Sequence, residues 1–126
     1  MRKQYHLRPS DRGLLAWDVD HLVRLTSTLA SFDMPLADIK ELDEPFWFGP
    51  QEEPPTCRRI AEHAKLIEET DLSYAIILDP DNRVMDGMHR VCKALNQGMR
   101  TIKAYRLPTL PPPDHVGVPS EQLPYD

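Results

Sequence analysis

The run Asp86-Gly87-Met88-His89-Arg90 combines residue types that bind phosphate groups. It stands where a short apolar stretch gives way to a helical pattern, and the start of a helix offers unpaired N–H groups and a partial positive charge to an anion. Glycine lets a ligand approach the backbone closely. Arg90 can form paired hydrogen bonds with phosphate oxygens, and His89 can donate one more and, near neutral pH, change its protonation when a ligand binds. We therefore predict a phosphate site formed by Gly87, the backbone of Met88, His89 and Arg90.

Asp86 has three roles open to it in this run. A carboxylate is poorly placed beside a bare phosphate, so we expect Asp86 to cap the helix, to pair with Arg90 four residues later, or to hold a metal ion or a ligand hydroxyl. The same five residues also describe an ordinary junction with a cap, a turn glycine and a surface ion pair. Residue types alone favour neither interpretation.

The elements that must position this run follow from the spacing of apolar residues. Asp18 and Thr56 are candidate N-caps, Pro35 confines its strand to a sheet edge, and turn-forming residues at 80–83 predict a hairpin. The continuous apolar run before that turn is typical of a central strand covered on both faces. We predict helices at 18–30, 56–69 and 88–97, and strands at 32–39, 74–79, 84–85 and 101–107.

Length and proline content define the expected domain organisation. The 126 residues, 40% of them hydrophobic and 28% charged, fit one small globular domain. The 13 prolines fall mainly into two groups, one between Pro45 and Pro55 and one from Pro108 onward. We expect a loosely ordered segment at 1–16, a folded domain at 17–107, and an extended proline-rich tail at 108–126.

Charge and apolar patterning limit the function classes. The chain has 15 basic and 20 acidic residues, net −5, so we expect no direct binding to DNA. No apolar run is long enough to span a membrane and no signal-peptide pattern follows Met1, so we expect a cytoplasmic protein with no membrane partner. Cys57 and Cys92 read as reduced thiols, and the paired spacing of a zinc site does not occur, so we predict no metal site.

Residues 76–78, a turn, residues 84–90, a short helix ending at Gly98 and a further strand resemble the core of the ParB/sulfiredoxin superfamily. The resemblance covers about 32–107. It implies an α+β fold, a small mixed β-sheet with flanking helices, in which the strand-to-helix run grips the phosphates of a nucleotide. Members include CTP-dependent ParB proteins, ATP-dependent sulfiredoxins and ADP-dependent free-serine kinases. The expected ligand is therefore ATP, ADP or CTP with Mg²⁺, or another phosphorylated small molecule.

Two departures from the family pattern exclude two of its activities. Sulfiredoxins carry a reactive cysteine at the position of Met88, and a thioether forms no thiolate, so we do not expect sulfinic-acid repair. ParB partition proteins continue into a helix-turn-helix region that has no counterpart here. We therefore do not expect centromere binding by this chain.

The segment around 40–48 holds the remaining candidates. Free-serine kinases use an acidic residue in a comparable segment as a general base, so the resemblance makes Glu41 and Glu44 catalytic candidates, which would take a hydroxyl proton or help to hold Mg²⁺. A solvated acidic turn is the alternative for each glutamate. Trp47 either stacks on a base or packs under the sheet.

These observations lead to one predicted function and one alternative. The first is a nucleotide- or phosphate-binding single-domain protein that hydrolyses the nucleotide or transfers a phosphoryl group to a small molecule. The alternative is a non-catalytic regulatory module that binds a protein partner through the loop at 42–55 and the proline-rich tail.

Overall fold

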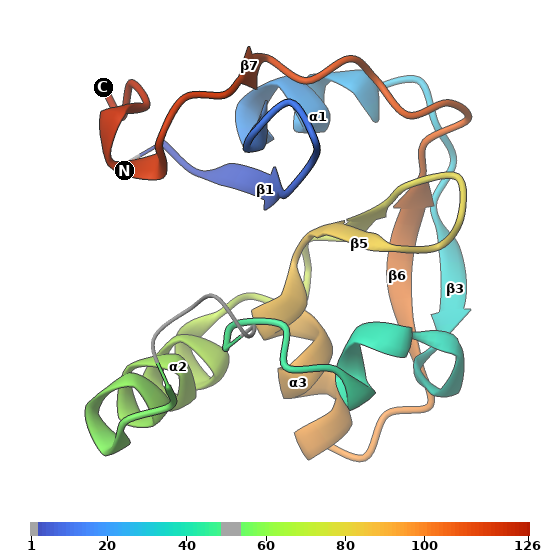
Figure 1. The fold of residues 1–126 in the computed structure, drawn as a ribbon. Helices are drawn as coiled ribbons and strands as arrows, with labels where there is room; N and C mark the ends of the chain where they lie inside the picture. The colour runs from blue at the N-terminus through green and yellow to red at the C-terminus, as the bar shows by residue number, and fades with distance from the viewer. Residues whose placement is uncertain (1–2, 49–53) are drawn as a thin grey trace.

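The computed structural model of the chain describes residues 3–48 and 54–126 and shows a small α+β fold (Figure 1). The class agrees with our prediction. The helices are α1 (Val19–Leu25), α2 (Cys57–Glu69) and α3 (Met88–Asn96). The strands are β1 (Tyr5–Arg8), β2 (Leu15–Asp18), β3 (Phe32–Pro35), β4 (Ile76–Leu78), β5 (Val84–Asp86), β6 (Thr101–Arg106) and β7 (His115–Val116). None of the described helices is long and apolar enough to cross a bilayer.

Four strands form a mixed sheet in the order β3-β6-β4-β5. β4 runs parallel to β6, whereas β3 and β5 pair antiparallel to their neighbours. The predicted hairpin is confirmed as β4 and β5, and the strand with Pro35 lies at the edge, as predicted. It ends at Pro35, earlier than expected, because the chain turns into a short 3₁₀ helix at Leu36–Asp38.

Side chains of β4 and β5 alternate between two clusters of buried residues. Ile76 and Leu78 pack with α3 on one face of the sheet, and Ile77 packs with Trp17 and Leu22 on the other. This alternation follows from the two-residue repeat of a strand. It confirms the prediction that the apolar run in β4 is covered on both faces.

A second sheet contradicts our prediction of a loosely ordered segment at 1–16 for the residues described, 3–16; residues 1–2 lie outside the described part of the chain. β1 pairs antiparallel with β2 from Tyr5 opposite Asp18 to Arg8 opposite Leu15, and β2 also pairs with β7 near the other end of the chain. The tail runs extended past α1 to reach this position (Figure 1). Trp17, only 1% exposed, donates a 2.8 Å hydrogen bond from Nε1 to the carbonyl oxygen of Pro111. The two ends of the chain therefore order each other.

α1 and α2 begin directly after the N-cap residues that we predicted for them. Asp18 accepts a hydrogen bond from the Asp20 amide, and Thr56 accepts one from the Arg59 amide. α1, however, ends at Leu25 and not at residue 30. The Thr26 hydroxyl donates to the carbonyl oxygen of Val23 at 2.7 Å, the kind of local hydrogen bond with which a threonine competes against helix formation.

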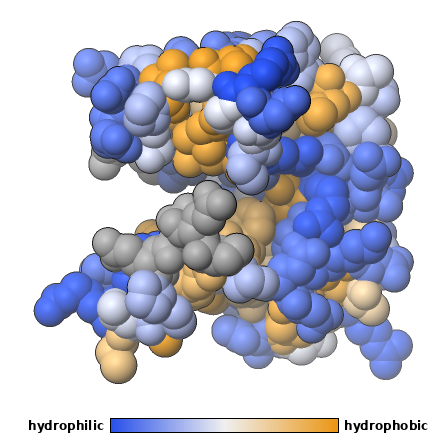
Figure 2. Space-filling model, viewed as in Figure 1, coloured by the Kyte–Doolittle hydropathy of each residue, from blue (hydrophilic) through white to orange (hydrophobic). Residues whose placement is uncertain are grey.

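A cleft divides the molecule into two parts. Figure 2 shows a cleft that separates the part containing α1 and the first sheet from the part containing α2 and α3. β1 and β5, an edge strand from each sheet, both contribute to cavities in this cleft. The strand-to-helix run at 86–90 therefore lies at the boundary between the two parts.

Candidate functional site

Gly87 forms the junction between β5 and α3 and adopts a left-handed conformation, with φ of 107°. A Cβ atom at this position would lie 2.6 Å from Cγ2 of Ile76 and 2.7 Å from Nη2 of Arg90. We expected the glycine to make room for a ligand. In the structure the missing Cβ instead leaves room for the side chains of Ile76 and Arg90, which pack against the junction. Glycine is also the residue that adopts this φ most readily.

The first turn of α3 has no side-chain cap, because its N-cap residue is Gly87. The amide N–H groups at the start of a helix have no partner within the helix and carry a partial positive charge. Gly87, Met88 and His89 at this helix start line a cavity of about 370 Å³, together with β1, β5 and the Phe46-Trp47 pair. We call this the helix-end cavity. The phosphate site stays a prediction.

His89 lines the helix-end cavity and is joined to α2 by a second histidine. Its Nε2 atom lies 2.9 Å from Nδ1 of His63, and the Trp47 ring stacks on both imidazoles at centroid distances of 4.3 Å for His63 and 4.5 Å for His89. Burial, followed by the neighbouring His63 and Arg90, lowers the pKa of His89 to about 4. His89 in this structure is therefore neutral near pH 7, and the predicted change of its protonation on ligand binding stays a prediction.

Trp47 is partly buried and packs against the larger core cluster as well as against the two histidines. Of the two predicted roles, packing is therefore the one seen in the structure. Because Trp47 also lines the helix-end cavity, it still borders the space that a ligand would occupy.

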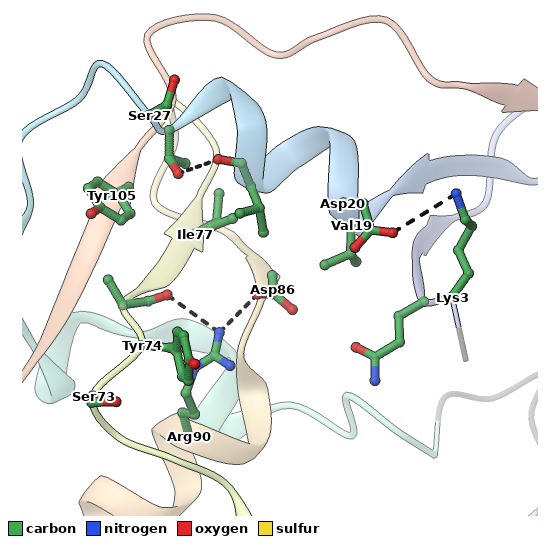
Figure 3. A pocket seen from close by; sticks show the side chains of 14 residues that line it. Lys3, Val19, Asp20, Ser27, Ser73, Tyr74, Ile77, Asp86, Arg90 and Tyr105 are labelled. Carbon is green, nitrogen blue, oxygen red and sulfur yellow. Dashed lines mark hydrogen bonds and ion pairs between the residues drawn. The ribbon is translucent and has the colours of Figure 1, made fainter. Parts of the chain in front are cut away.

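Arg90 forms the predicted ion pair with Asp86, with 2.9 Å between Nη2 and Oδ2. The same nitrogen donates to the carbonyl oxygen of Ala75 at 3.4 Å. Nε is buried and has no partner among the described residues. The guanidinium lines a different cavity, of about 660 Å³, which we call the Arg90 cavity (Figure 3). His89 and Arg90 therefore do not converge on one space as predicted, and Asp86 lies between the two cavities.

Glu41 and Glu44 lie together around Arg83 and outside the helix-end cavity. Glu41 is 3% exposed, and its Oε2 accepts a 2.7 Å hydrogen bond from the Val84 amide, whereas Oε1 has no partner among the described residues. A hydrogen bond from Arg83 lowers the pKa of Glu44. The solvated-turn interpretation is therefore wrong for Glu41. Both glutamates line a third cavity of about 560 Å³, the Arg83 cavity, which adjoins the helix-end cavity along Val84.

Sequence reasoning missed the residues that β1 brings to the cleft. His6 lines both the helix-end and the Arg83 cavities, and burial, with the nearby Arg8, lowers its pKa to about 4. Arg8 donates from Nε to His6 at 2.8 Å and pairs through Nη2 with the buried Asp79 at 3.0 Å. No local pattern marks these residues, because strand β1 is only four residues long.

Within residues 3–48 and 54–126, no three His, Cys, Asp or Glu side chains are grouped closely enough to hold a metal ion by themselves. Asp86 is the one carboxylate among the described residues that line the helix-end cavity. It is therefore the side chain that could contact a cation arriving with a phosphate group.

Comparisons with models of known protein families, with curated proteins and with solved structures find no match to this chain. The functional assignment of the cleft therefore depends on its own geometry.

Proposed function

We propose that this protein binds the phosphate group of a small molecule, with a nucleotide as the first candidate, at the start of α3. The observation that supports this most directly is the uncapped first turn of a nine-residue helix, which lines a cavity. Amide donors and the helix dipole both favour an anion there. If His63 donates to His89, the proton of His89 resides on Nδ1, which can donate to a phosphate oxygen.

The continuity of the cleft favours a ligand larger than phosphate alone. The helix-end and Arg83 cavities share lining residues from β1 and β5, so a nucleoside can extend from one into the other. Their volumes of about 370 and 560 Å³ are in the range of small-molecule sites. In this proposal Asp86 contacts a Mg²⁺ ion carried by the phosphates.

Turnover is the part of the proposal that concerns Glu41 and Glu44. The side chain of Glu44 is 41% exposed and paired with Arg83, so a substrate hydroxyl can reach it, whereas Glu41 is buried. We therefore assign Glu44 the role of general base if phosphoryl transfer or hydrolysis occurs. Phosphate release that is lost in Glu44→Gln and retained in Glu121→Gln, an exposed glutamate of the tail, would support an enzyme. Binding without release would support a sensor.

Calorimetric titration of ATP, ADP, CTP and GTP in the presence of Mg²⁺ tests the binding proposal. We expect at least one of them to bind at millimolar concentration or below. His89→Glu places a negative charge at the start of α3, where it favours the helix but repels phosphate, so affinity should fall about tenfold or more. Gln97→Glu adds the same charge at the other end of α3 and is the matched control. Absence of binding by all four nucleotides would contradict the proposal.

An interaction module is the second candidate, and the structure adds α2 to the surfaces it could use, because α2 is poorly covered. The loop predicted to bind a partner, 42–55, lies partly outside the described residues. No residue of α2 is buried, and Ile60 and Leu66 are 52% and 48% exposed. A protein that binds nucleotide without turnover and uses α2 to contact a partner would combine both observations.

A further inference from the structure

The Arg90 cavity adjoins the helix-end cavity along Gln4, Val19 and Asp86, but its lining has a different character. Five elements far apart in the sequence surround it: α1, β4, β5, α3 and β6 (Figure 3). Its volume of about 660 Å³ suits a small organic molecule. Val19 and Val23 of α1, together with Ala75 and Ile77, line it, so much of its wall is apolar.

Arg90 supplies the directional polar group of this cavity. Figure 3 shows its side chain reaching from α3 toward β4, with α1 on the opposite side. Both of its hydrogen bonds to described residues come from Nη2, and the buried Nε has none. A guanidinium has five N–H donors and forms its best hydrogen bonds with planar, two-oxygen acceptors. Nε is too buried to reach a ligand, so Nη1, from which neither of these bonds comes, is the nitrogen that can donate to an acceptor in the cavity.

The charges that line the cavity favour a ligand of low net charge. Arg90 is paired with Asp86, and Lys3 is paired with Asp18 at 2.9 Å and lies 4.0 Å from Asp20. The charged residues that line the cavity, Lys3, Asp20, Asp86 and Arg90, sum to zero, which disfavours a phosphate dianion more strongly than a carboxylate with a single charge. A carboxylate matches both the charge and the planar geometry of the guanidinium.

Two tyrosines indicate what the rest of the ligand is like. Tyr105 of β6 and the exposed Tyr74 line the cavity together with the aliphatic wall. Aromatic rings and branched aliphatic side chains pack best against an apolar or aromatic body. From these observations we propose that the Arg90 cavity is a second ligand site, which binds a small monocarboxylic acid with an apolar or aromatic body and holds its carboxylate at Arg90.

A matched pair of probes tests this site in the full chain. 3-Phenylpropionate carries a carboxylate on an aromatic body, and 3-phenyl-1-propanol has the same body without the charge. We expect the acid to bind at least tenfold more tightly than the alcohol in calorimetric titrations. Amide chemical shifts in two-dimensional NMR spectra should change most around Ala75, Ile77 and Tyr105.

Two variants separate the site from the stability of the fold. Arg90→Met should lower the affinity for the acid by about tenfold or more, and Arg100→Met, which removes the charge of an exposed arginine, should not change it. Because Arg90→Met leaves Asp86 without its partner and could unfold the junction, Val23→Trp is the second variant. Val23 is half exposed, and a large ring there fills the cavity while the ion pair stays intact.

Several results would overturn the second site. They are equal affinity for the acid and the alcohol, no binding of the acid at millimolar concentration, shift changes far from the cavity, or unchanged binding in Val23→Trp. The outcome is distinguishable from that of the phosphate proposal, because ATP titrated onto acid-saturated protein should bind without releasing the acid. Release of the acid by ATP would show that Arg90 belongs to the phosphate site. Binding of the acid without any binding of nucleotide would support the site in the Arg90 cavity and contradict the proposed phosphate site.

Discussion

At the scale of single residues, Gly87 determines whether the strand-to-helix junction can form. Its φ of 107° is strained for any residue with a side chain, and a Cβ atom would meet Ile76 and Arg90 at less than 3 Å. Because Gly87 has no Cβ, Nη2 of Arg90 can lie close to the junction, where it pairs with Asp86. One glycine therefore affects both cavities that meet at this junction.

Replacing Gly87 by alanine should therefore destabilise the protein strongly. Backbone strain and overpacking together predict a loss of roughly 2 to 4 kcal/mol in the free energy of unfolding. Gly98→Ala is the matched control: its φ is 74°, but no atom lies within 4 Å of the added Cβ, so it should cost only about 1 kcal/mol. Urea denaturation measures both values. Equal losses in the two variants would show that the contacts at Gly87 do not matter.

At the scale of elements, α2 is attached to the rest of the molecule through few contacts. It packs on α3, and the hydrogen bond between His63 and His89, with Trp47 stacked on both rings, joins the two helices. Burial lowers the pKa of His63 as well as that of His89. The contact between α2 and α3 therefore depends on neutral imidazoles.

Stability should fall as the pH is lowered from about 6.5 toward 4. In this range the unfolded chain binds protons that the folded protein does not bind, because the pKa of both His89 and His6 is lowered from 6.5 to about 4. The free energy of unfolding contributed by these two histidines is therefore fully present above pH 6.5 and decreases as the pH falls toward 4. Urea denaturation at pH 7, 6 and 5 measures the change before most carboxylates titrate.

Variants identify the groups responsible for that pH dependence. His89→Gln and His6→Gln should each flatten the curve, because each removes one of the two groups whose pKa is lowered to about 4 in the folded protein. A free energy of unfolding that stays constant between pH 7 and pH 5 would contradict the structural explanation.

The elements that the sequence predicted correctly are those with a local signal, such as a regular spacing of apolar residues, a turn or a cap. α2 and α3 have clear apolar spacing, the β4–β5 hairpin has an apolar run and a turn, and both helix caps are local hydrogen bonds. β1 has no such signal, because its order comes from pairing with β2, which pairs in turn with β7 about a hundred residues later.

The candidate site was predictable to a similar extent. The uncapped helix start and the Asp86–Arg90 ion pair follow from residues adjacent in sequence. The contact between His63 and His89 requires two helices to pack, and the division of His89 and Arg90 between two cavities depends on side-chain directions. Neither property is visible in spacing alone.

At the scale of the whole molecule, one buried ion pair connects the two sheets. Arg8 of β1 contacts Asp79, whose side chain is 5% exposed and which also accepts hydrogen bonds from the amides of Asp81 and Arg83 in the β4–β5 turn. The cleft lies beside this connection. The position of β1 over the cleft therefore depends on a charge pair between distant parts of the chain.

Arg8→Met should destabilise the protein, because it leaves the buried Asp79 carboxylate without its cation. We expect a loss of about 2 kcal/mol, less than for a fully buried pair because Arg8 is partly exposed. Lys103→Met breaks the exposed pair with Asp33 and should change stability by less than about 0.5 kcal/mol. Thermal or urea unfolding checks both, and equal effects would show that the Arg8 pair does not connect the two parts.

The strand order of the two sheets also determines which sheet can form first during synthesis. Every strand of the four-stranded sheet lies between residues 32 and 106, so that sheet can close before the tail has been made. The first sheet is complete only when His115–Val116 has paired with β2. The N–H of Trp17 likewise has its acceptor only after Pro111 has been synthesised. On the ribosome, β1 and β2 would thus emerge before the four-stranded sheet and yet be among the last elements to acquire their final packing.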